Sequence, residues 1–424
     1  SADWEASHRW FVGARAGYFT SNRTTANVVE EPLFVFGQPN IGLLDVPVPL
    51  QQVVGFQTDV SNDVSNVDRL SRVNAQIDAT LFGRLAGQHT LKSALQLDRR
   101  SNDVNKGGSA NRVLLQWNRQ PVGGQRGTYG FYRVFSNPVA PKRGEIFLGS
   151  VSDTTIGLFV QDAWTVSDRL TIKLGLRAEN ETVPFYSSVG PSGNVPPIHF
   201  SMLDKLAPRA GAAWDVTGDG RWKVHGSWGV FYDIFKLAMP QLAFGGLQSG
   251  SYFFKLETYD WPHLLDSPGC PPACPGGQAR EPTQINASFE NIDPGLDPMR
   301  TQELTVGVEH QLTARLALTA RFVHKQIDKA VEDIGSVDAN GNGIYVIGNP
   351  GYGHATEACD GVPYPRAVRD YDAVELVARR LLERNWALPA SYVWSRLHGN
   401  FSGLSQSDEN GRTEPNIGIA FDAA

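Results

Sequence analysis

The feature that most constrains this 424-residue chain is a repeated alternation of apolar and polar residues at period two. In the clearest segment, Val73 and Ile77 alternate with Gln76 and Asp78. Successive side chains of a β-strand point to opposite faces, so this segment predicts a strand with one apolar and one polar face. Because the alternation resumes after a short turn at 85–88, the two segments together predict a long β-hairpin.

The same pattern recurs along the whole chain and predicts an all-β fold of about twelve strands. We expect a single first strand near 10–20, five hairpins, and a last strand that begins near Ile417. The hairpin turns are expected at 85–88, 166–169, 217–221, 312–315 and 382–385.

The connections alternate in length as regularly as the side chains alternate in polarity. The hairpin turns have about four or five residues, whereas the joins at 234–301 and 329–370 have tens of residues, and every long join falls on the same side. Structureless loops of that length are uncommon in a compact soluble domain. Outer-membrane β-barrels, in contrast, have short periplasmic turns and long extracellular loops. The connections therefore favour a large antiparallel transmembrane β-barrel.

Composition agrees with this fold class and excludes others. Charged residues make up 19% of the chain, aromatic residues 10%, and there are 43 glycines, as in turn-rich all-β proteins. No apolar run approaches the roughly 18 residues that a transmembrane helix needs. Because 38 Lys+Arg stand against 44 Asp+Glu, the chain lacks the basic excess of nucleic-acid-binding proteins, and we expect no nucleic-acid partner.

The two faces of the strands must meet different surroundings. The polar face holds many ionisable groups in mid-strand, which a packed interior would accommodate only at a high cost in free energy. We therefore expect the polar face to border water or a polar plug and the apolar face to contact outer-membrane lipid. Tryptophans near the short turns fit the aromatic girdle of a membrane interface: Trp164, Trp214, Trp222 and Trp386. The polar-face residues are Arg72, Gln76, Asp78, Lys92, Asp98, Lys173, Arg177, Glu179, Lys223, Glu309 and Arg321. The alternative is a soluble two-sheet sandwich whose charged face meets solvent.

Several hairpin segments resemble a known family. Residues 157–164 (GLFVQDAW), 168–179 (DRLTIKLGLRAE) and 206–211 (LAPRAG) are similar to barrel hairpins of TonB-dependent receptors of the Gram-negative outer membrane. Residues 392–401 (YVWSRLHGNF) resemble the late barrel of the Oar-like branch, whose members often have an N-terminal carboxypeptidase-regulatory-like domain. The resemblance implies a barrel of about 22 strands, a plug that fills the lumen, and a TonB-type energising complex as partner.

The chain also departs from that family. No plug domain or TonB box is recognisable, and the end, Phe421-Asp422-Ala423-Ala424, is not the usual aromatic-terminated strand. An open sheet edge in hydrocarbon leaves backbone N–H and C=O groups without partners. We therefore expect residues 1–424 to be a partial outer-membrane β-barrel domain that other strands close. A complete twelve-stranded barrel is the alternative.

Candidate sites are few. Asp338, Asn340 and Asn342 repeat the first half of a calcium-binding loop, but Asn349 stands where the closing acidic ligand belongs, and a plain Asx/Gly turn is the alternative. We find no HExxH, GxSxG or Walker motif, so we expect no enzyme and no cofactor other than this possible calcium. Cys270 and Cys274 can close a small disulfide loop in an oxidising compartment.

The aromatic loop around the two cysteines has two interpretations. It contains Tyr252-Phe253-Phe254 and Trp261-Pro262, and it forms either a ligand-contacting rim or a segment packed on its neighbours.

Two functions follow from the resemblance. The first is energised uptake of a large or scarce solute, such as a siderophore, oligosaccharide or peptide, through the outer membrane. The second is a barrel without transport that serves as a surface scaffold or adhesion anchor within a larger assembly. The identity of the solute is not expected from any residue.

Overall fold

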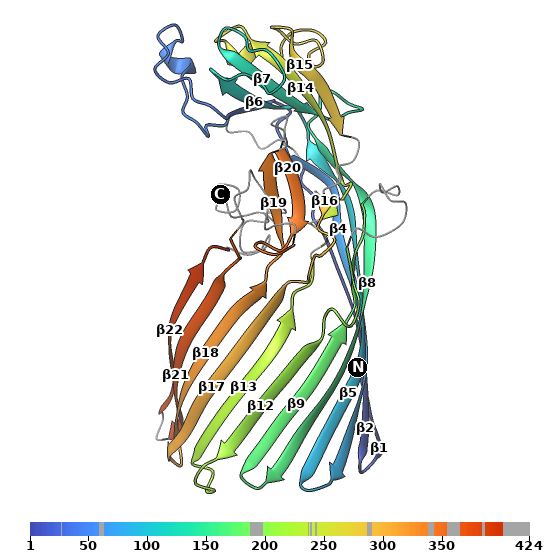
Figure 1. The fold of residues 1–424 in the computed structure, drawn as a ribbon, viewed down its shortest axis with the longest axis vertical. Helices are drawn as coiled ribbons and strands as arrows, with labels where there is room; N and C mark the ends of the chain where they lie inside the picture. Colours follow the sequence, from blue (N-terminus) through green and yellow to red (C-terminus); the bar gives the residue numbers. More distant parts are fainter. Residues whose placement is uncertain are drawn as a thin grey trace.

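The computed structural model describes residues 1–26, 28–58, 63–186, 198–235, 237, 240–241, 244–285, 291–337, 343–353, 365–383 and 386–401. Figure 1 shows a tall, curved wall of tilted strands with a smaller folded unit beyond one end. Among the residues placed, no helix has the length and apolar character needed to cross a membrane.

The wall consists of twelve described strands that pair antiparallel in chain order. They are β1 (Ala2–Ser7), β2 (Trp10–Asn22), β4 (Asp63–Arg84), β5 (Gln88–Gly108), β8 (Ile146–Ser167), β9 (Leu170–Glu179), β12 (Ala207–Asp215), β13 (Trp222–Tyr232), β17 (Arg300–Thr313), β18 (Leu316–Lys329), β21 (Arg369–Glu383) and β22 (Trp386–Gly399). Within the described residues, β1 pairs in the wall only with β2, and β22 pairs only with β21, so the wall is open at both edges.

The twelve described wall strands match the number predicted from the sequence, but the predicted single first strand was wrong. The strand expected to stand alone near 10–20 is β2, and it forms a hairpin with β1 across His8 and Arg9. The expected last strand near Ile417 lies outside the described residues. The large antiparallel β-sheet is therefore confirmed, and its twelve described strands form six hairpins.

The alternation of short and long connections is also confirmed. Connections 85–87, 168–169 and 314–315 close hairpins at one end of the wall, whereas the described parts of 233–299 and 330–368 lie at the other end. In the turn between β12 and β13, the Asp215 carboxylate accepts hydrogen bonds of 2.9 Å from the amides of Gly218 and Gly220. Both glycines have a φ of 75°, a conformation in which other residues are strained.

The two faces of the wall differ as expected. On the apolar face, Leu174 is 56% exposed and Ile77 59%, and no layer of described residues covers them. On the polar face, Asp78 is only 2% exposed, although it is the neighbour of Ile77 in the sequence. The aliphatic side chains are thus unpartnered, and the carboxylate is enclosed by other side chains of the polar face. A dry apolar centre with charges on its perimeter, which the sandwich alternative requires, is absent from the described wall.

Three strands are longer than the sequence indicated. β4 and β8 have 22 residues each and β5 has 21, whereas about 9 to 11 residues cross a bilayer. The β5–β8 pairing is continuous from Gln88 and Thr165 at the short-turn end to Gly107 and Ile146 at the long-loop end. In Figure 1 these strands rise past the rest of the wall toward the smaller unit.

That smaller unit, which we call the head, is a five-stranded sheet built from three of the long connections. Its strands are β3 (Leu33–Phe36), β6 (Arg112–Trp117), β7 (Gly130–Ser136), β14 (Leu247–Leu256) and β15 (Gln278–Ile285). One face of the sheet packs on an apolar core that includes Phe36, Trp117, Tyr132, Phe254 and Trp261. The 3₁₀-helices η1 (Val48–Leu50) and η2 (Trp261–His263) lie in segments that pack on this core.

A second packed region, which we call the collar, joins the head to the wall. It contains the hairpin of β10 (Glu181–Val183) with β11 (Ile198–Phe200). It also contains a three-stranded sheet of β16 (Asn291–Ile292), β19 (Glu332–Val337) and β20 (Gly343–Gly348). Val331, Ile347, Phe235 and Phe244 are among the buried side chains that hold these pieces together. The long loops are therefore packed structure where they are described.

Candidate functional site: the polar face and the long-loop end

The polar face of the wall is a network of cross-strand ion pairs. Lys92 lies 3.1 Å from Asp78, Lys223 lies 2.9 Å from Glu309, and Lys325 lies 2.9 Å from Glu303. Arg72 pairs with Asp98, and Arg321 pairs with Glu375. Each pair joins neighbouring strands, because oppositely charged residues stand opposite or diagonal to one another in the register. The face is therefore strongly hydrophilic, with its charges largely compensated by one another.

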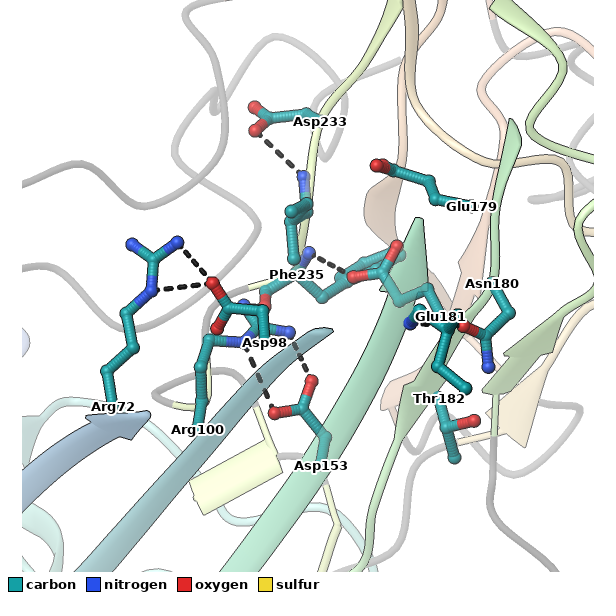
Figure 2. Close-up of polar contacts among 12 residues, drawn as sticks. Arg72, Asp98, Arg100, Asp153, Glu179, Asn180, Glu181, Thr182, Asp233 and Phe235 are labelled. Atoms are coloured by element: carbon teal, nitrogen blue, oxygen red, sulfur yellow. Dashed lines mark hydrogen bonds and ion pairs between the residues drawn. The ribbon is translucent and has the colours of Figure 1, made fainter. Parts of the chain in front are cut away.

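Arg100 of β5 links this network to the collar. Its guanidinium pairs with Asp153 of β8, and its Nη1 donates a 2.9 Å hydrogen bond to the carbonyl of Phe235. Figure 2 shows Arg72 and Arg100 side by side, each held by its own aspartate. Arg72 and Arg100 occupy directly opposite register positions. Two like charges in that arrangement repel, so the partners Asp98 and Asp153 are needed to keep both arginines in place.

Lys205 is the centre of a buried ionic cluster at the base of the collar. Its side chain is 0% exposed, and its Nζ lies 3.1 Å from Glu179 and 2.9 Å from Glu181. It also donates a 3.2 Å hydrogen bond to the carbonyl of Asp233. The other Glu181 oxygen accepts a 2.6 Å hydrogen bond from the Phe235 amide, a contact that Figure 2 shows. A buried cation needs such partners, because a charge removed from water without them is costly.

A neutral cluster extends this packing toward β4. Asn102 of β5 is fully buried, and its amide nitrogen donates a 3.1 Å hydrogen bond to the carbonyl of Arg69. Its oxygen accepts hydrogen bonds from the hydroxyl of Tyr186 and the side chain of Gln241. Segments far apart in the sequence are thus joined by hydrogen bonds to a single side chain.

Tryptophans band the apolar face at the short-turn end. Trp214, Trp222 and Trp386 are 49%, 40% and 50% exposed, and Trp164 stacks on the ring of His89 at 5.5 Å. Two further tryptophans belong to the band: Trp4 of β1 and Trp10 of β2, which are 66% and 46% exposed. The sequence did not indicate their place in the band, because the short turn between β1 and β2 was not expected. Rings in this position suit the boundary between lipid and water.

The aromatic loop of the sequence analysis is a packed segment. Tyr252, Phe254 and Trp261 are buried in the head core, and the Trp261 indole donates a 3.0 Å hydrogen bond to the carbonyl of Leu50. Cys270 and Cys274 form a disulfide and are buried in the same core. For Tyr252, Phe254 and Trp261, the structure therefore agrees with a segment packed on its neighbours and not with a ligand-contacting rim.

The suggested metal site remains a prediction. Asp338, Asn340 and Asn342 lie outside the described residues. In the ranges that the structure does describe, no group of three or more His, Cys, Asp or Glu side chains is placed to hold a metal ion.

The sequence indicated the paired wall residues but not the buried clusters. Arg72, Asp78, Lys92, Lys223 and Arg321 stand out because they alternate with apolar residues. Lys205 and Asn102 lie where the alternation has ended, and their partners are distant in the sequence. No local pattern distinguishes them from ordinary exposed residues.

Comparison with known proteins finds one relative by sequence and solved structures of low similarity. The TonB-dependent transporter Oar of Myxococcus xanthus is 28% identical over 376 residues, which cover 83% of this chain and 34% of the relative. The chain thus spans about a third of the length of that relative. Two solved structures are similar in fold. The siderophore receptor PiuA from Acinetobacter baumannii has a TM-score of 0.45 and 10% identity, over 94% of this chain and 46% of PiuA. FpvA of P. aeruginosa, in a complex with a heterologous pyoverdine and iron, has a TM-score of 0.47 and 11% identity, over 97% of this chain and 40% of FpvA.

The family assignment itself rests on nearly the whole chain. The sequence model of the family described as "Outer membrane beta barrel domain" matches residues 1–422. The open antiparallel wall, its lipid-suited apolar face and its aromatic band agree with that match. The chain belongs to the outer-membrane β-barrel domain family, and its place is the outer membrane of a Gram-negative bacterium.

Proposed function

We propose that this chain forms part of the wall and the extracellular surface of a TonB-dependent receptor that takes up a large or scarce solute. The polar face would line the solute path, and the head and collar would form the extracellular entrance. A TonB-type complex in the inner membrane would supply energy, and a plug within the complete protein would close the bore at rest. The similarity to the transporter Oar supports this proposal.

The observation that supports it most directly is the ionic polar face. A wall strand such as β13 places Lys223 and His225 toward Glu309, while Val224 and Trp228 face the opposite way. Charged side chains of both signs on this scale require water or a polar filling beside them. A barrel wide enough to hold that water or plug is the kind that transports large solutes.

Uptake by cells that carry the full-length gene tests the proposal. The cells would be offered radiolabelled ferric siderophores, oligosaccharides and peptides as separate panels, with and without a protonophore. We expect accumulation of one panel member that requires both this gene and the proton-motive force. A matched strain with the gene deleted is the control. Accumulation that continues unchanged with the protonophore would contradict energised transport.

A second function is a barrel without transport that serves as a surface scaffold or adhesion anchor. The observation that favours it is the head, which has its own apolar core and disulfide beyond the end of the wall. The complete reading frame separates the two functions. A plug and a TonB box upstream of this domain favour transport, and a gene without either favours the scaffold.

A further inference from the structure

The face of the head sheet opposite its apolar core holds an alternating row of arginine side chains and phenyl rings. The guanidinium groups of Arg112 and Arg133 lie 4.0 and 4.1 Å from the ring centre of Phe135. Those of Arg133 and Arg280 lie 5.2 Å from the ring centre of Phe253. The register produces this order, because Arg112 is opposite Phe135, Arg133 is opposite Phe253, and Phe253 is opposite Arg280. We call Arg112, Arg133 and Arg280 the arginine row.

The positive charge of the arginine row is poorly compensated. Arg112 pairs with Glu145 at 2.7 Å, and it is the one member of the row with an ion pair among the described residues. Arg133 donates to the hydroxyl of Ser251 at 2.8 Å, and its Nε–H is buried with no acceptor. Across the part of the head that the structure places, Arg280 contacts the Phe253 ring without a hydrogen bond or ion pair. Three cations therefore share one carboxylate.

Burial adds to this imbalance at the centre of the row. Burial lowers the pKa of the Arg133 guanidinium, Glu145 opposes that effect, and the like charges of Arg112 and Arg280 lower the pKa further. Arg133 stays protonated, since an arginine pKa begins far above neutrality. An anion placed beside the row would reduce the repulsion among the three charges.

A concavity lies beside Arg112, at one end of the row, where the head meets the wall. A pocket of about 440 Å³ is lined by Arg23, Lys106 and Arg112, together with Asp68 and Glu145. Lys106 pairs with Asp68 at 3.0 Å, so those two charges compensate each other. Arg23 adds a further cation to the lining. A volume of this order accommodates a small solute.

We propose that the arginine row binds a small, multivalent oxyanion from solution, held by its phosphate or carboxylate groups. A guanidinium stacked on a phenyl ring keeps its N–H edge free for an oxyanion, which it can bind with two parallel hydrogen bonds. Charge complementarity selects this ligand class over a neutral sugar or a cation. The site belongs to the head and holds for a barrel with or without transport, so it goes beyond the proposed function.

Calorimetric titration of the full-length protein in nanodiscs with inorganic pyrophosphate tests the site. Sodium chloride at matched ionic strength is the baseline. We expect saturable binding to the native protein and about tenfold weaker binding to each of Arg280→Gln and Arg133→Gln, because each removes a charged hydrogen-bond donor. Arg366→Gln is the matched control, since that guanidinium lies 4.7 Å from the ring centre of Tyr352, outside the row. We expect its affinity to equal that of the native protein.

Glu145→Gln supplies a test of opposite sign. It frees Arg112 from its carboxylate while it keeps a polar side chain near Ser249, so we expect tighter pyrophosphate binding. A variant that simply disturbs the head would bind more weakly instead. Resistance of the head to proteolysis checks that it stays folded in each variant.

Several results would overturn the inference. These are no saturable pyrophosphate binding to the folded native protein, equal loss in Arg366→Gln, or weaker binding in Glu145→Gln. Binding to vesicles of an anionic phospholipid that free pyrophosphate fails to displace would assign the row to a lipid surface and reject a dissolved ligand. Because no uptake is measured, failure here leaves the transport proposal untouched, and failure of uptake leaves this site untouched.

Discussion

At the scale of single residues, buried charge in this protein is concentrated where the wall meets the loops. Each wall pair has at least one partly exposed partner, and an exposed pair contributes about 0 to 1 kcal/mol. Lys205 differs, since it is 0% exposed and has two carboxylate partners. Loss of one partner from a buried pair leaves a charge without compensation, which is far more costly than loss of a surface pair.

Lys205→Ala therefore has a definite expected cost. Glu179 and Glu181 would remain buried with like charges, and we expect the free energy of unfolding to fall by about 3 to 5 kcal/mol. The measurement is denaturant unfolding of the full-length protein in lipid vesicles, with Lys173→Ala as the control. Lys173 lies on the polar face of β9, where its side chain is exposed and has no ion pair among the described residues. Equal effects of the two variants would show that the cluster does not stabilise the protein.

Substitutions on opposite faces of β9 test which face meets lipid. Leu176 is 44% exposed on the apolar face. Leu176→Arg should reduce the stability of the folded barrel in vesicles by about 2 to 4 kcal/mol, as expected for arginine near the bilayer midplane. Lys173→Leu on the polar face should change it by less than about 0.5 kcal/mol. If the larger loss came from Lys173→Leu, the faces would be assigned the wrong way round.

At the scale of elements, the wall could be predicted from the sequence and the head could not. Wall strands such as β9 and β13 each have a hairpin partner near in the sequence, and a single apolar face gives them a period-two pattern. The head strands are short, and β3, β6 and β14 come from three different connections. Their partners are set by long-range packing, on which local pattern gives no information.

The lengths of β4, β5 and β8 escaped prediction for a related reason. Beyond the membrane the alternation ends, as in the stretch Arg100–Gly108, which is almost wholly polar. Backbone pairing continues there because it requires only a neighbouring strand, which β8 supplies. Polarity patterns report the solvent around a strand, so they mark where lipid ends and not where the strand ends.

Trp261 provides a test of the head as a separately packed element. Its ring lies 5.3 Å from Phe34 and 5.2 Å from Phe36, between ring centres. Trp261→Ala should destabilise the head by about 3 to 5 kcal/mol and leave the wall folded. Proteolysis of the head, followed beside the heat-dependent gel shift of the barrel, measures both. Val48→Ala is the control, because that side chain is 80% exposed nearby. Loss of the gel shift in Trp261→Ala would show that head and wall fold as one unit.

At the scale of the whole molecule, the two open edges determine how the chain can exist in a bilayer. We expect strands beyond the described residues to pair with β1 and β22, since unpaired backbone groups in hydrocarbon cost several kcal/mol each. The 424-residue chain alone should therefore give no heat-dependent gel shift in vesicles, whereas the full-length protein should give one.

A crosslink tests the alternative of a barrel closed by these twelve strands. Trp4→Cys on β1 and Tyr392→Cys on β22 lie on the apolar face of opposite edges. In a barrel completed by other strands they stay apart, and we expect no disulfide under oxidation. Trp4→Cys with Val12→Cys is the positive control, because those residues are opposite each other in β1 and β2. Efficient crosslinking of Trp4→Cys to Tyr392→Cys would establish the twelve-stranded closure.

The unbroken pairing of β5 with β8 has a mechanical consequence. The paired strands β5 and β8 run without a break from the periplasmic turns to the base of the head, so they form a stiff connection between the membrane-embedded wall and the head. If the membrane-embedded part tilts, this connection tilts with it, and the head is displaced most because it is farthest from the membrane. A molecule that binds the head from outside the cell could therefore exert a torque on the barrel. A fluorophore attached to the head would report the tilt of the barrel in the membrane.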